Sequence, residues 1–128
     1  MTAPPVLSEA AWKAQVLQLA QLYRWQWFHL NDARRQVTDP QTGEAKLVGD
    51  AEAADFPDLT LWRDRVVFAE LKGTTGSLTP GQKRCLEALR HAGQEVYAWW
   101  PRDVEEVQAV LFRRGRVPAE VDVGGGLL

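Results

Sequence analysis

Three charged residues, Asp58, Glu70 and Lys72, have the types and the spacing that phosphodiester chemistry requires. Residues 59–62 and 66–72 are rich in residues typical of strands and are separated by a short polar turn, which predicts a β-hairpin. If the pairing is symmetric about the middle of the turn, Asp58 lies directly opposite Glu70 and both side chains share one face. Strand alternation adds Lys72 to that face. The sequence therefore predicts that two carboxylates and one ammonium group converge.

Two opposed carboxylates repel each other, so a site that holds both needs a compensating charge. Mg²⁺ or Mn²⁺ fits, because hard cations take carboxylate, carbonyl and water oxygens, and we expect Asp58, Glu70 and the Leu71 backbone carbonyl as ligands. Lys72 would then position or deprotonate the attacking water, or neutralise charge on the phosphate. A solvated strand face also explains Glu-x-Lys taken alone, and the opposed Asp58 favours the catalytic interpretation.

Two further residues each have a functional and a structural interpretation. Glu9 borders the inward stripe of a predicted helix, where it is a further candidate ligand, or an acid favoured by the helix dipole and paired with Lys13. Gln82 stands three residues after Thr79, which predicts a capping box. The same helix start directs free N–H groups toward anions, so Gln82 is also a candidate catalytic residue that contacts a phosphate or orients the water.

These residues resemble the virus-type replication-repair nuclease (VRR-NUC) branch of the PD-(D/E)XK nuclease superfamily. The resemblance runs from about Ser8 to Leu111 and rests on the helical acid, Pro-Asp, Glu-x-Lys, the Gln that opens the next helix, and the segments Trp25-Gln26-Trp27-Phe28-His29 and Gly93-Gln94-Glu95-Val96-Tyr97. It implies catalytic roles for Glu9, Asp58, Glu70, Lys72 and Gln82. The chain departs from the family pattern at Asp55, where Gly is usual, and in the long segment 31–55.

The expected fold is α/β, with a PD-(D/E)XK restriction-endonuclease-like core of order α-β-β-β-α-β-α and a mixed central sheet flanked by helices. We expect one nuclease domain over residues 1–128, with its core at about 8–112 and a basic arm and flexible tail at 113–128. The expected elements are helix 8–23, strand 25–30, hairpin 59–72, helix 80–92, strand 95–100 parallel to strand 66–72, and a last helix that begins with a capping box of Asp103 and Glu106. Turn residues at 39–43 predict a β-turn excursion beside the active site.

The charge distribution favours a nucleic-acid partner although the net charge is −2. Residues 59–116 hold 10 Lys and Arg against 7 Asp and Glu, a local balance of +3. Clustered basic side chains bind phosphates regardless of sequence, although a solvated helix face explains part of the cluster equally well. The candidate DNA-binding residues are Arg34, Arg35, Lys83, Arg84, Arg90, Arg113 and Arg114.

The predicted function is a Mg²⁺- or Mn²⁺-dependent endodeoxyribonuclease that hydrolyses branched DNA such as four-way junctions in replication, recombination or repair. The resemblance also implies a C₂ homodimer, which would offer two sites to a symmetric junction. The alternatives are a catalytically silent DNA-binding module and an RNA-directed hydrolase. The single Cys85 argues against a disulfide framework or a zinc site, no apolar run is long enough for a membrane span, and a reducing cytoplasm is expected.

Overall fold

The computed structural model describes residues 5–30, 35–48 and 54–115. Its core is a four-stranded mixed sheet in the order β1-β4-β5-β6. The strands are β1 (Gln26–His29), β4 (Leu59–Trp62), β5 (Val66–Leu71) and β6 (Glu95–Trp99). β1, β4 and β5 pair antiparallel, whereas β5 and β6 pair parallel. The predicted mixed sheet and the predicted order of its elements are confirmed.

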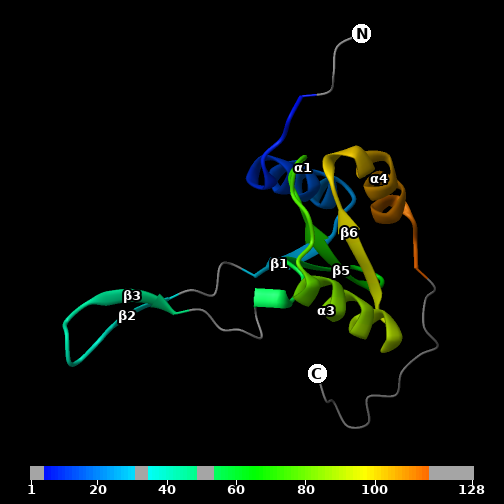
Figure 1. The fold of residues 1–128 in the computed structure, drawn as a ribbon. Helices are drawn as coiled ribbons and strands as arrows, with labels where there is room; N and C mark the ends of the chain where they lie inside the picture. Colours follow the sequence, from blue (N-terminus) through cyan, green and yellow to red (C-terminus); the bar gives the residue numbers. More distant parts are fainter. Residues whose placement is uncertain (1–4, 31–34, 49–53, 116–128) are drawn as a thin grey trace.

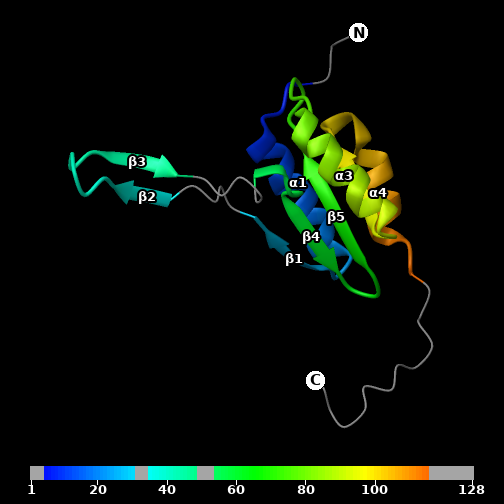
Figure 2. The same cartoon turned by 60° about the horizontal axis from the view of Figure 1, so that its bottom comes forward.

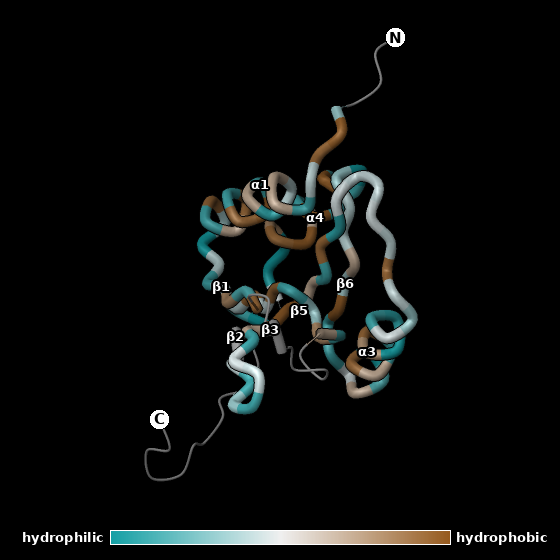
Figure 3. Tube along the Cα trace, turned by 60° about the vertical axis from the view of Figure 1, so that its left-hand side comes forward, coloured by the Kyte–Doolittle hydropathy of each residue, from teal (hydrophilic) through white to brown (hydrophobic). Residues whose placement is uncertain are grey.

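Helices cover the sheet on two sides. Helix α1 (Glu9–Leu22) and helix α4 (Val104–Phe112) lie on one face, and helix α3 (Pro80–His91) lies on the other (Figures 1 and 3). The core lies between the sheet and the α1–α4 layer, where Trp12, Trp99 and Leu111 are completely buried. Trp12 Nε1 and the Lys72 amide both donate to the carbonyl oxygen of Trp99, so one acceptor joins α1, the end of β5 and the end of β6.

The hairpin of β4 and β5 has the predicted register. Leu59 pairs with Ala69, and Trp62 pairs with Val66 across a turn at residues 63–65. Alternation then buries one set of side chains against the α1–α4 layer, and Leu61, Val67 and Leu71 have no exposed surface. The register matters because a slip of one residue would turn every side chain of a strand to the other face.

The helix starts follow from short-range polar contacts. Ser8 caps α1, and its side-chain oxygen accepts a hydrogen bond from the Ala11 amide at 3.1 Å. Thr79 and Gln82 form the predicted capping box at the start of α3. Gly93, at φ +86°, follows this helix in the left-handed region that suits a glycine.

One predicted cap is wrong. Asp103 makes no side-chain cap on α4, because Pro101 begins a short 3-10 helix (Pro101–Asp103) and the Asp103 carboxylate turns back to accept from the Trp100 amide at 2.8 Å. The capping box with Glu106 therefore does not form, and the last helix begins at Val104.

The predicted turn at 39–43 belongs to a second, two-stranded antiparallel sheet. It consists of β2 (Arg35–Thr38) and β3 (Ala45–Val48), with Thr38 paired to Ala45. Asp39 shapes the turn, since its carboxylate accepts from the Gln41 amide at 2.8 Å and Gly43 adopts φ +73°. This hairpin extends away from the four-stranded sheet in two views (Figures 1 and 2), and the residues that join it to the sheet lie outside the described ranges. Its expected place beside the active site stays a prediction.

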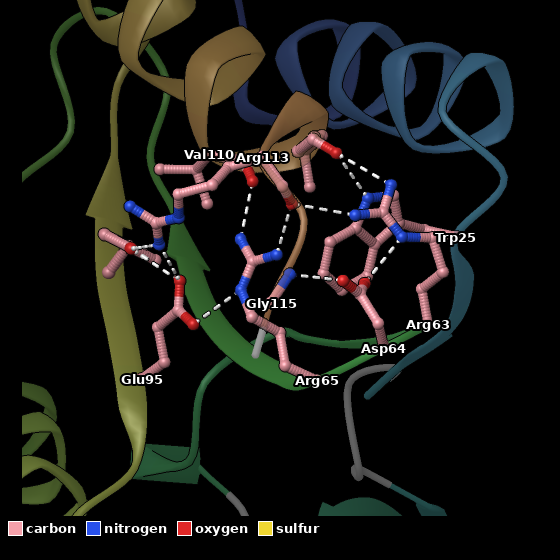
Figure 4. A network of polar contacts seen from close by, with 10 residues as sticks. Trp25, Arg63, Asp64, Arg65, Glu95, Val110, Arg113 and Gly115 are labelled. Carbon is pink, nitrogen blue, oxygen red and sulfur yellow. Dashed lines mark hydrogen bonds and ion pairs between the residues drawn. The ribbon is translucent and has the colours of Figure 1, made fainter. Parts of the chain in front are cut away.

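A polar network closes the end of the molecule where the β4–β5 turn lies (Figure 4). Arg63 donates to the carbonyls of Tyr23, Leu111 and Arg113, and Arg65 donates to those of Val110 and Arg113. Both guanidinium groups lie over the Trp25 ring, at 4.6 and 5.0 Å from its centre. The turn arginines thus satisfy carbonyls that the ends of α1 and α4 leave free.

The network also changes the interpretation of the expected basic arm. Arg113 is held through its carbonyl, and its side chain forms an ion pair with Glu95 at 2.9 Å. Gly115 donates to the carboxylate of Asp64, whose pKa lies below its usual range chiefly because of the hydrogen bond from Arg63. The chain is therefore anchored through Gly115, and the rest of the predicted arm and tail lies outside the described residues.

Candidate metal centre

The register of the hairpin brings Asp58 and Glu70 together at its open end. The Asp58 amide donates to Glu70 Oε2 at 3.2 Å, and the Leu71 amide donates to Asp58 Oδ2 at 3.3 Å. Each carboxylate is therefore held by the backbone of the opposite strand. Glu70 is only 2% exposed, whereas Asp58 is half-buried.

Glu9 is the third carboxylate of the site. Oxygen atoms of Glu9, Asp58 and Glu70 all lie within 4.8 Å of one another. The first turn of α1 reaches this point because Gly73 allows close contact: a Cβ placed on Gly73 would lie 2.7 Å from the Glu9 amide nitrogen and 2.9 Å from the Leu7 carbonyl oxygen. The Thr74 amide also donates to the Leu7 carbonyl at 2.9 Å.

Gln82 combines the two interpretations that the sequence left open. Its side-chain oxygen accepts from the Thr79 amide at 2.9 Å, which completes the capping box. Its side-chain nitrogen donates to Glu70 Oε1 at 3.2 Å. One amide group thus caps the start of α3 and contacts the carboxylate cluster at the same time. Lys72 joins from the end of β5, with Nζ 3.7 Å from Glu70 Oε1.

Glu70 is the electrostatically unusual member of the cluster. Burial, then the negative charge of Asp58, raises the pKa of Glu70 to about 8. The ammonium group of Lys72 acts in the opposite direction and offsets only part of this rise. At neutral pH the cluster by itself favours a proton on Glu70, and a cation placed between the carboxylates would displace that proton.

The donor set fits a hard divalent cation. It offers carboxylate oxygens and contains no sulfur or imidazole, which is the ligand chemistry of Mg²⁺ and Mn²⁺. A cleft of about 570 Å³ opens beside the cluster and is lined by Val6, Leu7, Ser8, Glu9, Lys72, Gly73, Thr75, Gly76 and Ser77. Glu9 and Lys72 both line this cleft, so waters and a phosphate have room beside these two side chains. The ligand role of the Leu71 carbonyl stays a prediction.

The predicted DNA-binding residues have different outcomes. Lys83, Arg84 and Arg90 are exposed on α3, and none of them forms an ion pair within the described part of the chain. Arg114 is also exposed. The Arg113 side chain is already paired with Glu95, as described above. Arg34 lies outside the described residues, and of Arg35 only its place in β2 is described.

Two residues near the site were given no structural role in the sequence analysis. Gly73 is one, and its signal was a glycine directly after the Glu-x-Lys strand. Asp55 is the other, since a Cβ placed on Gly81 would lie 2.5 Å from both of its carboxylate oxygens. The carboxylate thus lies against the first turn of α3, where a helix dipole stabilises negative charge. The chain has Asp55 where the family usually has glycine, and it has Gly81 in α3 at the place where a Cβ would clash with the Asp55 carboxylate.

The geometry agrees with what the comparisons found. The model of the VRR-NUC domain matches residues 7–99, which include Glu9, Asp58, Glu70, Lys72 and Gln82. The chain belongs to the VRR-NUC family. No curated protein sequence and no solved structure matches it. Membership in VRR-NUC implies a nuclease-type function, and none of the described helices has the length and apolar character needed to cross a membrane.

Proposed function

We propose that this VRR-NUC chain is a Mg²⁺- or Mn²⁺-dependent endonuclease that hydrolyses phosphodiester bonds of DNA. The observation that carries the proposal is the convergence of Glu9, Asp58 and Glu70 within 4.8 Å, with Lys72 Nζ beside the buried carboxylate. Carboxylates held this close together are costly to maintain unless they bind a positive charge, and Lys72 offsets only part of the repulsion. Metal binding explains why the fold keeps them together.

The residues have distinct roles in the proposed reaction. Asp58 and Glu70, with the Leu71 carbonyl and Glu9, would hold the cation, which when bound would polarise the phosphate and activate a water. As an ammonium group, Lys72 would position the attacking water or stabilise charge on the phosphate oxygens, and it would accept a proton from the water only as a neutral amine. Gln82 orients Glu70 and, at the N-terminus of α3, would contact a phosphate or the water.

A branched substrate such as a four-way junction, a C₂ homodimer and a role in replication, recombination or repair come from the family resemblance. A cytoplasmic place is supported by the single cysteine, Cys85. A catalytically silent binding module is disfavoured because the acids and Lys72 are all in place. The remaining alternative is an RNA-directed hydrolase, so the cleavage test includes RNA substrates.

The test is a cleavage panel of duplex, flap, single-stranded and four-way-junction DNA, with matched RNA, in Mg²⁺, in Mn²⁺ and in EDTA. We expect metal-dependent cleavage of DNA by the wild type. Asp58→Asn and Glu70→Gln should each abolish cleavage, because each removes a ligand charge from the cation, while DNA binding in EDTA stays the same or strengthens. Glu87→Gln, on the exposed face of α3, is the matched control. Equal cleavage by the wild type and both site variants would overturn the site.

A further inference from the structure

Within the residues that the structure describes, the sheet face that carries Asp58 and Glu70 is covered over only part of its width. Helix α3 packs on β6, where Leu86 and Val96 are buried. Figure 2 shows β1 and β4 without a helix in front of them. The opposite face of these strands is buried under α1 and α4, so only the face that carries Asp58 and Glu70 is partly uncovered.

Two aromatic side chains stand on the uncovered part. Phe28 is 58% exposed and Trp62 is 38% exposed. Phe28 pairs with Thr60, which pairs with Phe68, and Glu70 follows Phe68 by two residues. Directly paired residues, and residues two apart on one strand, point to the same face. Phe28 and Trp62 therefore lie on the same side of the sheet as the metal-binding carboxylates.

Their spacing suits a nucleic-acid strand. Phe28 is level with Thr60, two residues from Asp58, which corresponds to ~7 Å along the sheet, and Trp62 is ~7 Å further. Successive stacked bases in a duplex are ~3.4 Å apart. Aromatic rings ~7 Å apart are spaced at about twice that distance, which suits bases that are unstacked from one another. Trp62 is also fixed in place, because its Nε1 donates to Gln26 Oε1 at 3.0 Å. A fixed ring loses little conformational freedom when it binds.

We propose that Phe28 and Trp62 form a stacking platform for unpaired bases next to the scissile phosphate. This inference rests on the proposed nuclease function and names its substrate class: DNA that is single-stranded beside the cut, as at a flap or an opened junction. In a closed duplex the face of each base is already occupied by its neighbour. Aromatic stacking is tolerant of sequence, because every base has a π-face. The platform selects structure rather than sequence.

A second copy of the chain is the competing occupant of this face. The continuity of the face favours the substrate: the same strands that carry Phe28 and Trp62 lead directly to Asp58 and Glu70. A second copy of the chain bound over Phe28 and Trp62 would block a DNA strand from reaching Asp58 and Glu70. The oligomeric state is therefore measured in the same experiment.

The test compares substitutions that remove an aromatic ring with substitutions that keep one. Phe28→Leu and Trp62→Leu keep an apolar side chain but cannot stack, whereas Phe28→Tyr and Trp62→Phe can. The probe is a flap DNA with 2-aminopurine at the first unpaired position, beside a closed duplex of the same sequence. Binding is measured in EDTA by fluorescence, and cleavage is measured in Mg²⁺. Phe112→Leu, at an exposed aromatic on α4, is the matched control.

We expect the wild type to quench the 2-aminopurine. Each leucine variant should lose about tenfold in affinity for the flap and little for the duplex, and the aromatic variants and Phe112→Leu should behave as the wild type. The platform would be overturned if the leucine variants bound the flap and the duplex as tightly as the wild type does. A change of molar mass in light scattering caused by Phe28→Leu or Trp62→Leu would also overturn it. If the wild type cleaves none of the DNAs, the nuclease proposal fails, and the quenching and binding series still decides whether Phe28 and Trp62 stack on bases.

Discussion

Glu70 shows how far a single residue can be predicted. Its position opposite Asp58 follows from the turn length and strand alternation, and the structure confirms it. The degree of its burial does not follow from the hairpin, because that depends on Gln82 and on the way α3 packs over the strand. The double role of Gln82 has the same origin: its place in the capping box is a local signal, and its contact with Glu70 is a tertiary one.

The raised pKa of Glu70 predicts a particular dependence of stability on pH. Between pH ~4.5 and ~8 the folded chain keeps a proton on Glu70 that the unfolded chain has lost. Stability contributed by this group should therefore fall as pH rises through this window, by at most ~1.4 kcal/mol per pH unit. The measurement is urea unfolding in EDTA from pH 5 to 8.

Two comparisons isolate Glu70 in that measurement. Glu70→Gln carries no ionisable group at this position, so its stability should fall less steeply than that of the wild type over the same pH range. Mg²⁺ should reduce the wild-type slope, since bound cation replaces the proton. Identical slopes for the wild type and Glu70→Gln would show that the carboxyl group titrates normally in the folded chain.

At the scale of elements, helix ends were predictable where the signal is local and wrong where a neighbouring element competes. Thr79 and Gln82 cap α3 as expected, because both partners lie within one turn. Asp103 fails as a cap of α4, because Pro101 starts a 3-10 helix immediately before it. The contact between Gly73 and the start of α1 joins residues far apart in the sequence, and no local pattern reports it.

Gly73 provides a prediction that separates the placement of α1 from the chemistry of Glu9. Gly73→Ala would place a Cβ within 3 Å of backbone atoms of Leu7 and Glu9, and backbone cannot give way as a flexible side chain can. We expect a loss of ~1–3 kcal/mol in stability, typical of overpacking. Cleavage should also fall, because the first turn of α1 moves away from Asp58.

The control for this change is another glycine. Gly43→Asn changes a turn residue of the β2–β3 hairpin that has open space around it, and Asn tolerates the left-handed conformation found there. It should leave both stability and cleavage nearly unchanged. Thermal unfolding and single-turnover cleavage measure the two effects, and a Gly73→Ala chain with wild-type values in both would refute the role of this contact.

At the scale of the whole molecule, the basic side chains of α3 predict the salt dependence of DNA binding. Lys83 and Arg84 lie in the first turn of α3, next to Gln82, and Arg90 lies about two turns further along. If all three contact phosphates, replacing them with Gln should weaken binding in EDTA and reduce the slope of log K against log salt by ~2–3. Titrations at several salt concentrations measure this slope.

The control removes a positive charge elsewhere. Arg24→Asn neutralises an exposed residue that follows α1 and adopts φ +68°, a conformation that Asn tolerates. Its salt slope should equal that of the wild type. An unchanged slope in the triple variant would show that the basic face of α3 is only solvated, a result that would leave the metal centre unaffected.

The shared acceptor at Trp99 has a consequence for how the protein is made. Glu9, Asp58, Glu70 and Lys72 all leave the ribosome before the Trp99 carbonyl that fixes both Trp12 and the Lys72 amide. At ~5–20 residues per second, the ribosome needs on the order of seconds to add the intervening helix and strand. During that interval Trp12 in α1 and the Lys72 amide lack the shared acceptor that joins them to the end of β6. We therefore expect the nascent chain to carry its acids unassembled, and cleavage activity to begin only after β6 has been synthesised and paired.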